Sequence, residues 1–254
     1  MSREELLTQW REEAARGMSG WDFSHIDGRY ETDPLPWDYR TRVKEFLRPG
    51  VRLLDLGTGG GELLLSLHHP YELTSVTEGW APNFELCRRK LEPLGITVKS
   101  YDSEQDDVLP FEDDSFDLVL SRHESYDLKE IHRVLKKGGF FVTQQVGGEN
   151  SLPLAKQLLP GFEGNFAGFN LENQLPKFRD AGFRIMVSDQ AFVQGRFLDV
   201  GALCFQASVC PWEFPGFSVD ACKEVLFRLQ DQVETLGFIP NLEHRFLVIA
   251  KNKK

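Results

Sequence analysis

Between residues 51 and 146, short apolar runs alternate with segments whose apolar residues recur at helical spacing. This alternation constrains the fold more than any other feature, because it favours a parallel sheet with helices on both faces. The expected strands are residues 51–56, 73–77, 96–100, 116–121 and 140–145, and the expected helices are residues 62–67, 82–94 and 128–135. Gly95 is expected to end the second helix, and Gly138-Gly139 to end the third.

The flanking segments are read in the same way. Residues 1–50 are expected to form a helical cap, with one helix through Leu6 and Trp10, a loop over 17–37 and a second helix from Tyr39 to about Leu47. After residue 146 the pattern is less regular. It predicts helices over 151–159, 171–181, 199–207 and 219–236, strands over 183–187 and 245–250, and a turn over 237–241. The last strand is therefore expected to be antiparallel at the sheet edge.

We therefore predict one domain over residues 1–254, in three parts: a cap (1–50), a ligand-binding core (51–146) and a substrate-side half with a helical insertion (147–254). The formal net charge of −10 disfavours a nucleic-acid partner, because a negative field repels phosphate. The four cysteines and six histidines show no metal-ligand spacing, so no metal site is expected. Without an apolar run of membrane-spanning length or a secretory leader, a cytoplasmic location is expected, and the oligomeric state stays open.

A glycine loop, Gly57-Thr58-Gly59-Gly60-Gly61, joins the first expected strand to its helix. Glycines let the backbone turn tightly and approach a ligand closely. Glu62 stands where a dinucleotide fingerprint needs its third glycine, and the lysine of a P-loop is absent. Asp55, two residues before the loop, would repel a pyrophosphate but suits a ligand that carries an ammonium group. It could instead bond backbone N–H groups of its own loop.

Carboxylates also follow the next two strands. Glu78 ends the second strand, where a carboxylate can accept both hydroxyls of a ribose. Asp102 follows the third strand, where a carboxylate can reach an adenine amino group. These positions favour a nucleoside ligand, although Glu78 could also be a surface carboxylate.

Together with residues 109–121 and Leu135-Lys136-Lys137-Gly138-Gly139, these features resemble the class I S-adenosylmethionine-dependent methyltransferases over about residues 51–146. The resemblance implies a doubly wound, Rossmann-like sheet of about seven strands, with the last one antiparallel, and S-adenosyl-L-methionine as cofactor. It places Gly57 and Gly59 at the methionine end, Glu78 at the ribose, Asp102 at the adenine and Ser121 at the reactive end. The full implied cofactor set is Asp55, Gly57, Thr58, Gly59, Glu78, Gly79, Asp102, Ser103 and Ser121.

The methyl acceptor is less constrained. His123 is the candidate base and Glu124 the group that orients it or binds a cationic substrate, because both follow the carboxyl end of the fourth strand. His123 could instead be a loop histidine held by a carbonyl. Arg122, Trp37 and Tyr39 are candidate substrate contacts, with Trp212 and its aromatic neighbours as a second wall, although such aromatics also pack caps onto cores. A small-molecule acceptor is favoured; an RNA methyltransferase, a non-catalytic S-adenosylmethionine-binding protein and a nicotinamide-dependent oxidoreductase are the alternatives.

Overall fold

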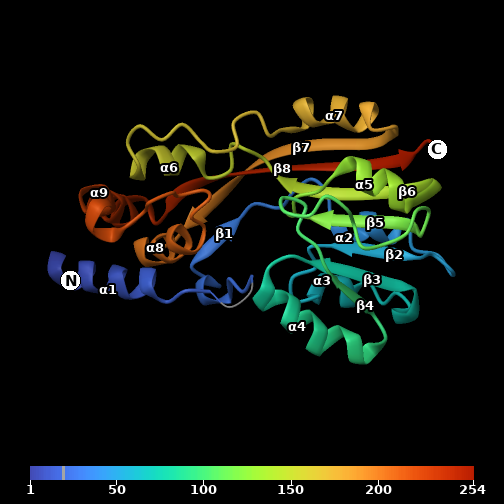
Figure 1. The fold of residues 1–254 in the computed structure, drawn as a ribbon. Helices are drawn as coiled ribbons and strands as arrows, with labels where there is room; N and C mark the ends of the chain where they lie inside the picture. Colours follow the sequence, from blue (N-terminus) through green and yellow to red (C-terminus); the bar gives the residue numbers. More distant parts are fainter. Residues whose placement is uncertain (19–20) are drawn as a thin grey trace. The chain divides into compact units, whose positions relative to one another are not determined.

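A computed structural model describes residues 1–18 and 21–254, so Ser19 and Gly20 of the loop expected over 17–37 lie outside the described residues. One eight-stranded sheet has the order β1-β7-β8-β6-β5-β2-β3-β4 (Figure 1). The elements divide between two compact units. Unit 1 comprises Met1–Leu35, Gly147–Phe169 and Ala191–Arg245, and unit 2 comprises Pro36–Val146, Asn170–Gln190 and Phe246–Lys254.

Unit 2 contains the parallel strands that the apolar runs predict. Strand β2 pairs in parallel with β3 and β5, β3 with β4, and β5 with β6. The chain moves one way along the sheet from β2 to β4 and the other way from β5 to β6. Right-handed crossovers therefore put α3 and α4 on one face and α5 on the opposite face. The bounds are α2 (Tyr39–Lys44), β2 (Leu53–Leu56), α3 (Glu62–Ser66), β3 (Thr74–Glu78), α4 (Ala81–Leu91), β4 (Thr97–Ser100), β5 (Phe116–Arg122), α5 (Leu128–Val134), β6 (Leu135–Val146) and α7 (Leu171–Asp180).

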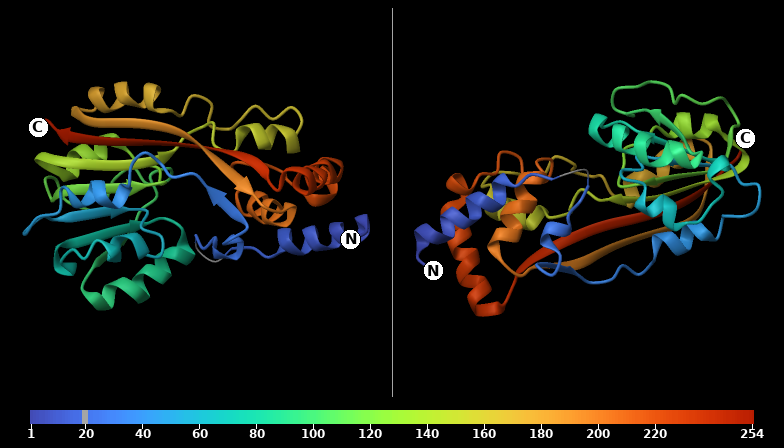
Figure 2. Two further views of the ribbon diagram at one scale, coloured as in Figure 1. Left: turned by 180° about the vertical axis from the view of Figure 1, so that it is seen from behind. Right: turned by 90° about the horizontal axis from the view of Figure 1, so that it is seen from below.

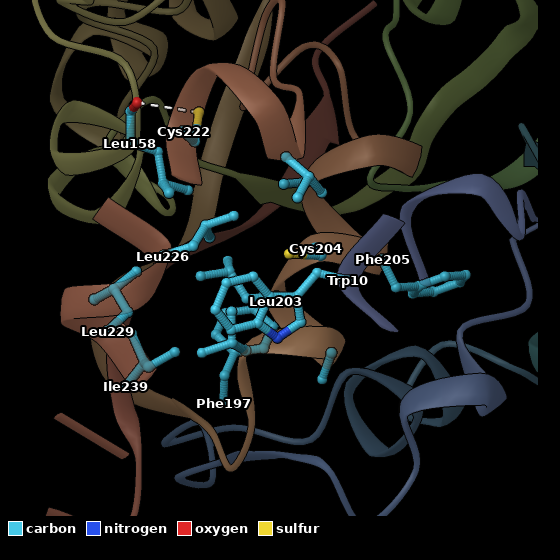
Figure 3. Packing of buried hydrophobic residues seen from close by; sticks show 14 of the residues in the cluster. Trp10, Leu158, Phe197, Leu203, Cys204, Phe205, Cys222, Leu226, Leu229 and Ile239 are labelled. Carbon is cyan, nitrogen blue, oxygen red and sulfur yellow. Dashed lines mark hydrogen bonds between the residues drawn. The ribbon is translucent and has the colours of Figure 1, made fainter. Parts of the chain in front are cut away.

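Unit 1 is largely helical. Its elements are α1 (Arg3–Ala15), β1 (Tyr30–Thr32), α6 (Leu152–Leu158), α8 (Val200–Val209) and α9 (Val219–Leu236). Helices α1, α8 and α9 lie side by side and contact one another (Figure 2). Ser2 caps α1 with a capping box, and Ser218 caps α9. The core between the helices holds Trp10, Leu203 and Leu226, all buried (Figure 3).

Strands β7 (Phe183–Phe197) and β8 (Ile239–Asn252) each contribute residues to both units. The two strands run in opposite directions (Figure 1). The predicted antiparallel direction is therefore confirmed, but β8 lies between β7 and β6 and not at the sheet edge, and both strands are far longer than the sequence pattern indicated. The expected turn over 237–241 is also wrong, because Gly237 caps α9 and β8 begins two residues later. The eighth strand, β1, was not predicted; its three residues pair antiparallel with β7.

Gly138-Gly139 does not end a helix. Helix α5 stops at Val134, and both glycines lie inside β6. In the pairing with β5, Phe116 faces Leu135 but Leu118 faces Phe140, so residues 136–139 bulge out of the ladder. Gly138 has φ +77°, a backbone conformation that glycine adopts without strain. Sequence spacing alone does not separate such a bulge from a helix stop.

Among the described residues, no helix is both long and apolar enough to span a bilayer. Over the same residues, no group of three or more histidine, cysteine, aspartate or glutamate side chains is placed to hold a metal ion.

Candidate functional site

The glycine loop crosses from the end of β2 onto β3. The backbone N–H of Thr58 donates to the carbonyl of Thr77 at 3.1 Å, and Gly57, Gly59 and Gly61 all have positive φ. Helix α4 holds the loop from the side: the Cys87 thiol donates to the Gly59 carbonyl at 2.6 Å. Lys90 Nζ likewise donates to the Gly60 carbonyl at 2.7 Å. The loop is thus fixed by contacts with both β3 and α4.

Glu78 connects the end of β3 to this loop. Its Oε2 accepts from the Gly59 backbone N–H at 2.9 Å, and its Oε1 accepts from the Trp80 N–H at 3.0 Å. The side chain is only 3% exposed, and burial raises its pKa above the ordinary value. The alternative that Glu78 is a surface carboxylate is therefore wrong. A carboxylate oxygen accepts more than one hydrogen bond, so Glu78 keeps capacity for a ligand hydroxyl.

Glu124 covers the same loop from the strand on the other side. A Cβ atom at Gly57 would overlap the Glu124 side chain, which shows how closely the two approach. Ser125 Oγ donates to Glu124 Oε1 at 3.2 Å, and Ser103 Oγ donates to Ser125 Oγ at 2.9 Å. This chain of bonds links the turn after β4 to the turn after β5. The sequence places Glu124 near this edge of the sheet, but its fold-back over Gly57 could not be read from spacing.

Three carboxyl groups thus surround the glycine loop: Asp55, Glu78 and Glu124. Burial raises the pKa of Asp55 to about 7 and that of Glu124 to about 7, and the charge of Glu78 adds to both shifts. The Arg122 guanidinium acts in the opposite direction on Asp55 but does not outweigh burial. No hydrogen bond from a backbone N–H to the Asp55 carboxyl is found among the described residues. Ionisation of these groups makes the site anionic above about pH 7, and a cationic ligand would favour the ionised form, so the site suits a cation better than a phosphate.

The raised pKa values predict how the stability of the ligand-free protein changes with pH. Between about pH 4 and 7 the folded protein holds protons on Asp55 and Glu124 that the unfolded chain has released, so their contribution to stability falls as pH rises through this window. Asp55→Asn removes one of these titrating groups. We therefore expect the melting temperature of this variant, minus that of wild type, to increase as pH rises from 5 to 8.

Scanning calorimetry across this range measures the difference in melting temperature. Asp107→Asn, at an exposed position of the same unit, is the control and should follow wild type at every pH. A constant difference between Asp55→Asn and wild type would contradict the assignment of a buried, protonated Asp55.

Asp102 and Ser121 lie at the predicted strand ends, but their side chains have internal partners. Asp102 accepts from the Glu104 N–H at 2.9 Å and from Gln105 Nε2 at 2.6 Å, and so caps its own turn. Ser121 Oγ donates to the Glu124 carbonyl at 3.0 Å and is fully buried. A Cβ atom at Gly79 would lie 2.8 Å from the Cβ of Asp102, so these two strand ends abut. Their predicted cofactor contacts stay predictions.

His123 is joined to Trp37 through Gln144, a residue that sequence reasoning did not single out. Trp37 Nε1 donates to Gln144 Oε1 at 2.8 Å, and Gln144 Nε2 lies 3.0 Å from His123 Nε2. Because an indole nitrogen only donates, it fixes the Gln144 amide with its NH₂ toward the histidine. His123 Nε2 must then accept, so the neutral ring carries its proton on Nδ1. The available signal was the polar run Thr143-Gln144-Gln145 at the end of an otherwise apolar strand.

The aromatic residues proposed as substrate contacts have structural partners. Tyr39 is 6% exposed, and its hydroxyl donates to the Val142 carbonyl at 3.1 Å. Trp37 is 8% exposed, whereas Arg122 is exposed at the end of β5. Trp212, of the proposed second wall, is 38% exposed and belongs to unit 1. Their contact with a substrate stays a prediction.

A doubly wound sheet with a glycine loop after its central strand and a carboxylate at the end of the next strand is typical of the Rossmann-like class of folds. Residues 54–143 match the model of the methyltransferase domain family. This match covers the segment that carries the glycine loop and Glu78, and it agrees with the resemblance to class I S-adenosylmethionine-dependent methyltransferases that the motifs predicted.

The chain is also similar to a curated relative and to solved structures. The phthiotriol/phenolphthiotriol dimycocerosates methyltransferase of Mycobacterium tuberculosis H37Rv is 28% identical over 158 residues, or 52% of this chain and 57% of that protein. The match thus spans less than two thirds of the relative's own length. A functionally unknown protein from Deinococcus radiodurans R1 has a TM-score of 0.59 at 15% identity, covering 91% of this chain and 96% of that one. A putative methyltransferase from Bacillus halodurans has a TM-score of 0.56 at 16% identity, covering 85% and 99%. The structural likenesses support the fold.

Proposed function

We propose that this protein transfers a methyl group from S-adenosylmethionine to a small-molecule acceptor. The observation that carries the proposal is the group of two buried carboxyls, Asp55 and Glu78, with the half-buried Glu124, around a loop with positive-φ glycines. S-adenosylmethionine carries positive charge on its sulfur and its ammonium group. A nicotinamide dinucleotide would instead bring a pyrophosphate into an anionic site, which is unfavourable.

The residues of unit 2 fit the parts of this cofactor. Glu78 would bind the ribose hydroxyls, the amides of the glycine loop would hold the carboxylate of the methionine end, and Asp55 or Glu124 would attract its ammonium group. The bound cofactor supplies a methyl group on a positively charged sulfur, already activated for transfer. The contribution of the protein is then to hold the acceptor close and aligned and to exclude water.

An acceptor that carries a proton of high pKa also needs a base. The Glu124 carboxyl has a pKa of about 7, so near neutral pH a large fraction of it is ionised and can accept a proton. His123, with its proton on Nδ1, would donate a hydrogen bond to the acceptor. The name of the mycobacterial relative describes a lipid acceptor; for this chain we propose only the broader class of small organic molecules.

Calorimetric titration of the wild-type protein with S-adenosylmethionine, S-adenosylhomocysteine and NADH tests the cofactor. We expect micromolar binding of the first two and none of NADH. Binding of NADH alone would overturn the proposal. If S-adenosylmethionine binds but no acceptor in a broad screen leads to release of S-adenosylhomocysteine, a non-catalytic binding protein is favoured. Methylation of RNA in the same screen would favour an RNA methyltransferase.

The Trp37–Gln144–His123 chain gives a separate prediction. Nitrogen-detected NMR of wild-type protein should show His123 with a protonated Nδ1 and an unprotonated Nε2. In Gln144→Glu the carboxylate accepts only, so the proton should move to Nε2. Trp37→Phe, which removes the donor that fixes the amide, should give a mixture of the two tautomers. A protonated Nε2 in the wild type would contradict the assignment.

A further inference from the structure

Unit 1 contains a network of polar side chains that takes no part in the site of unit 2. It joins Tyr30 of β1, Asn150 and Ser151 before α6, Glu213 between α8 and α9, and Asn241 of β8. Asn150 Nδ2 donates to Glu213 Oε1 at 2.6 Å. Asn241 Nδ2 donates to Tyr30 Oη at 3.1 Å and to Ser151 Oγ at 3.3 Å. Asn150, Glu213 and Asn241 therefore meet at the Ser151 hydroxyl, and Tyr30 joins the network through Asn241.

Two acceptor atoms of this network are buried without a donor. Among residues 1–18 and 21–254, neither Glu213 Oε2 nor Asn241 Oδ1 has a hydrogen-bond partner. Asn241 is 4% exposed, and Ser151, which lies within bonding reach of both residues, is fully buried. A buried acceptor without a donor costs free energy that a folded protein rarely tolerates. Both atoms are acceptors, so a group that donates hydrogen bonds would satisfy both.

The charges of the network point to a cation as that donor. Arg245 forms an ion pair with Glu243 at 3.1 Å, and the Tyr30 hydroxyl also donates to Glu243 at 2.6 Å. The neighbouring His244 is not a compensating charge, since burial lowers its pKa. The Arg245 guanidinium is therefore the one cation beside two carboxylates. It pairs with Glu243, and Glu213 has no cation of its own among the described residues. Burial accordingly raises the pKa of Glu213.

The surroundings of Glu213 suit an organic cation rather than an inorganic ion. Its sequence neighbour Trp212 packs edge-on against Trp21, with 5.6 Å between ring centroids, and both rings are partly exposed, at 38% and 51%. Aromatic rings attract ammonium groups and cover apolar bodies. Ser151 has φ +53°, which is strained for a residue other than glycine and is typical of functional positions.

We propose that Glu213 and Asn241 form a binding site in unit 1 for the ammonium group of a small organic amine with an apolar body. The ammonium donates to Glu213 Oε2 and Asn241 Oδ1, and the exposed tryptophan pair contacts the rest of the molecule. The site uses none of the residues around the glycine loop, so its binding can be measured whether or not the proposed methyl transfer is correct.

A matched pair of probes tests the charge requirement in the wild-type protein. 2-Phenylethylamine is an ammonium ion at neutral pH, and 2-phenylethanol has the same body with a neutral hydroxyl. Titration with the amine should shift the side-chain amide NMR signals of Asn150 and Asn241. We expect the dissociation constant from this titration to be at least tenfold lower than for the alcohol, a difference of about 1.4 kcal/mol in binding free energy. Equal affinities, or no shift with either probe, would overturn the proposal. The hydrogen-bond donor would then be a proton bound to the Glu213 carboxyl.

Variants then locate the site. Glu213→Gln should weaken amine binding at least tenfold and leave the alcohol unchanged. Glu163→Gln removes an exposed carboxylate of the same unit, paired with Lys156 at 2.5 Å, and should bind both probes as wild type does. If Glu213→Gln fails to fold, Asn241→Asp is the variant to test. A second carboxylate in the site should tighten binding of the amine and leave binding of the alcohol unchanged. Unchanged amine affinity in a folded Glu213→Gln would also overturn the proposal.

Discussion

Replacing Glu78 by alanine is expected to weaken S-adenosylmethionine binding at least a hundredfold, or about 2.7 kcal/mol. The substitution removes the carboxylate proposed to accept the ribose hydroxyls. It also removes the two bonds, to the Gly59 and Trp80 N–H groups, that hold the loop against β3. Bonds to a charged group contribute about 1.5–3 kcal/mol each, so the unliganded protein should lose stability as well. Calorimetric titration and thermal unfolding measure the two effects separately.

Two companion variants make this expectation specific. Glu78→Gln keeps the shape, but its NH₂ group would face a backbone N–H donor, so we expect a loss intermediate between wild type and alanine. Glu72→Ala changes an exposed carboxylate just before the same strand and should bind as wild type does. If Glu78→Ala binds S-adenosylmethionine with wild-type affinity, Glu78 does not contact the ribose and the site must be reassigned.

Gly57→Ala should have the second large effect, on folding itself. Its φ of +61° costs an alanine about 1–2 kcal/mol, and the new Cβ would overlap the Glu124 side chain. The Glu124 side chain must move to relieve this overlap, which adds to the loss. Urea unfolding should therefore show a larger loss than for Gly50→Ala. Gly50 has φ +83° and nothing within 4 Å of its added Cβ, so that control contains the backbone strain alone.

The overlap with Glu124 has its own test. Combining Gly57→Ala with Glu124→Ala removes the atoms that collide, so the double variant should recover the overpacking part of the loss. The free energies of unfolding in this double-mutant cycle should therefore be non-additive. Simple additivity would show that Glu124 does not lie over Gly57 in solution.

Local sequence was sufficient for the elements that hold the glycine loop. The apolar run ending at Leu56, the glycines after it and the carboxylate ending β3 predicted the strands, the loop and the place of Glu78. Such features depend on residues near one another in the chain, and the carboxyl ends of parallel strands meet at one edge whatever the details of packing. The family resemblance and the doubly wound fold follow from the same segment.

Only the tertiary structure decided which distant side chains meet. The lengths of β7 and β8, and the bulge at Gly138, depend on pairing between strands far apart in sequence. The fold of Glu124 over Gly57, the Trp37–Gln144–His123 chain and the network that links Glu213 to Asn241 through Asn150 and Ser151 each join separate segments. Their hydrogen bonds and burial exist only after the chain has closed these loops. Sequence therefore determined the scaffold and its loop, whereas packing decided the protonation and partners of the groups around them.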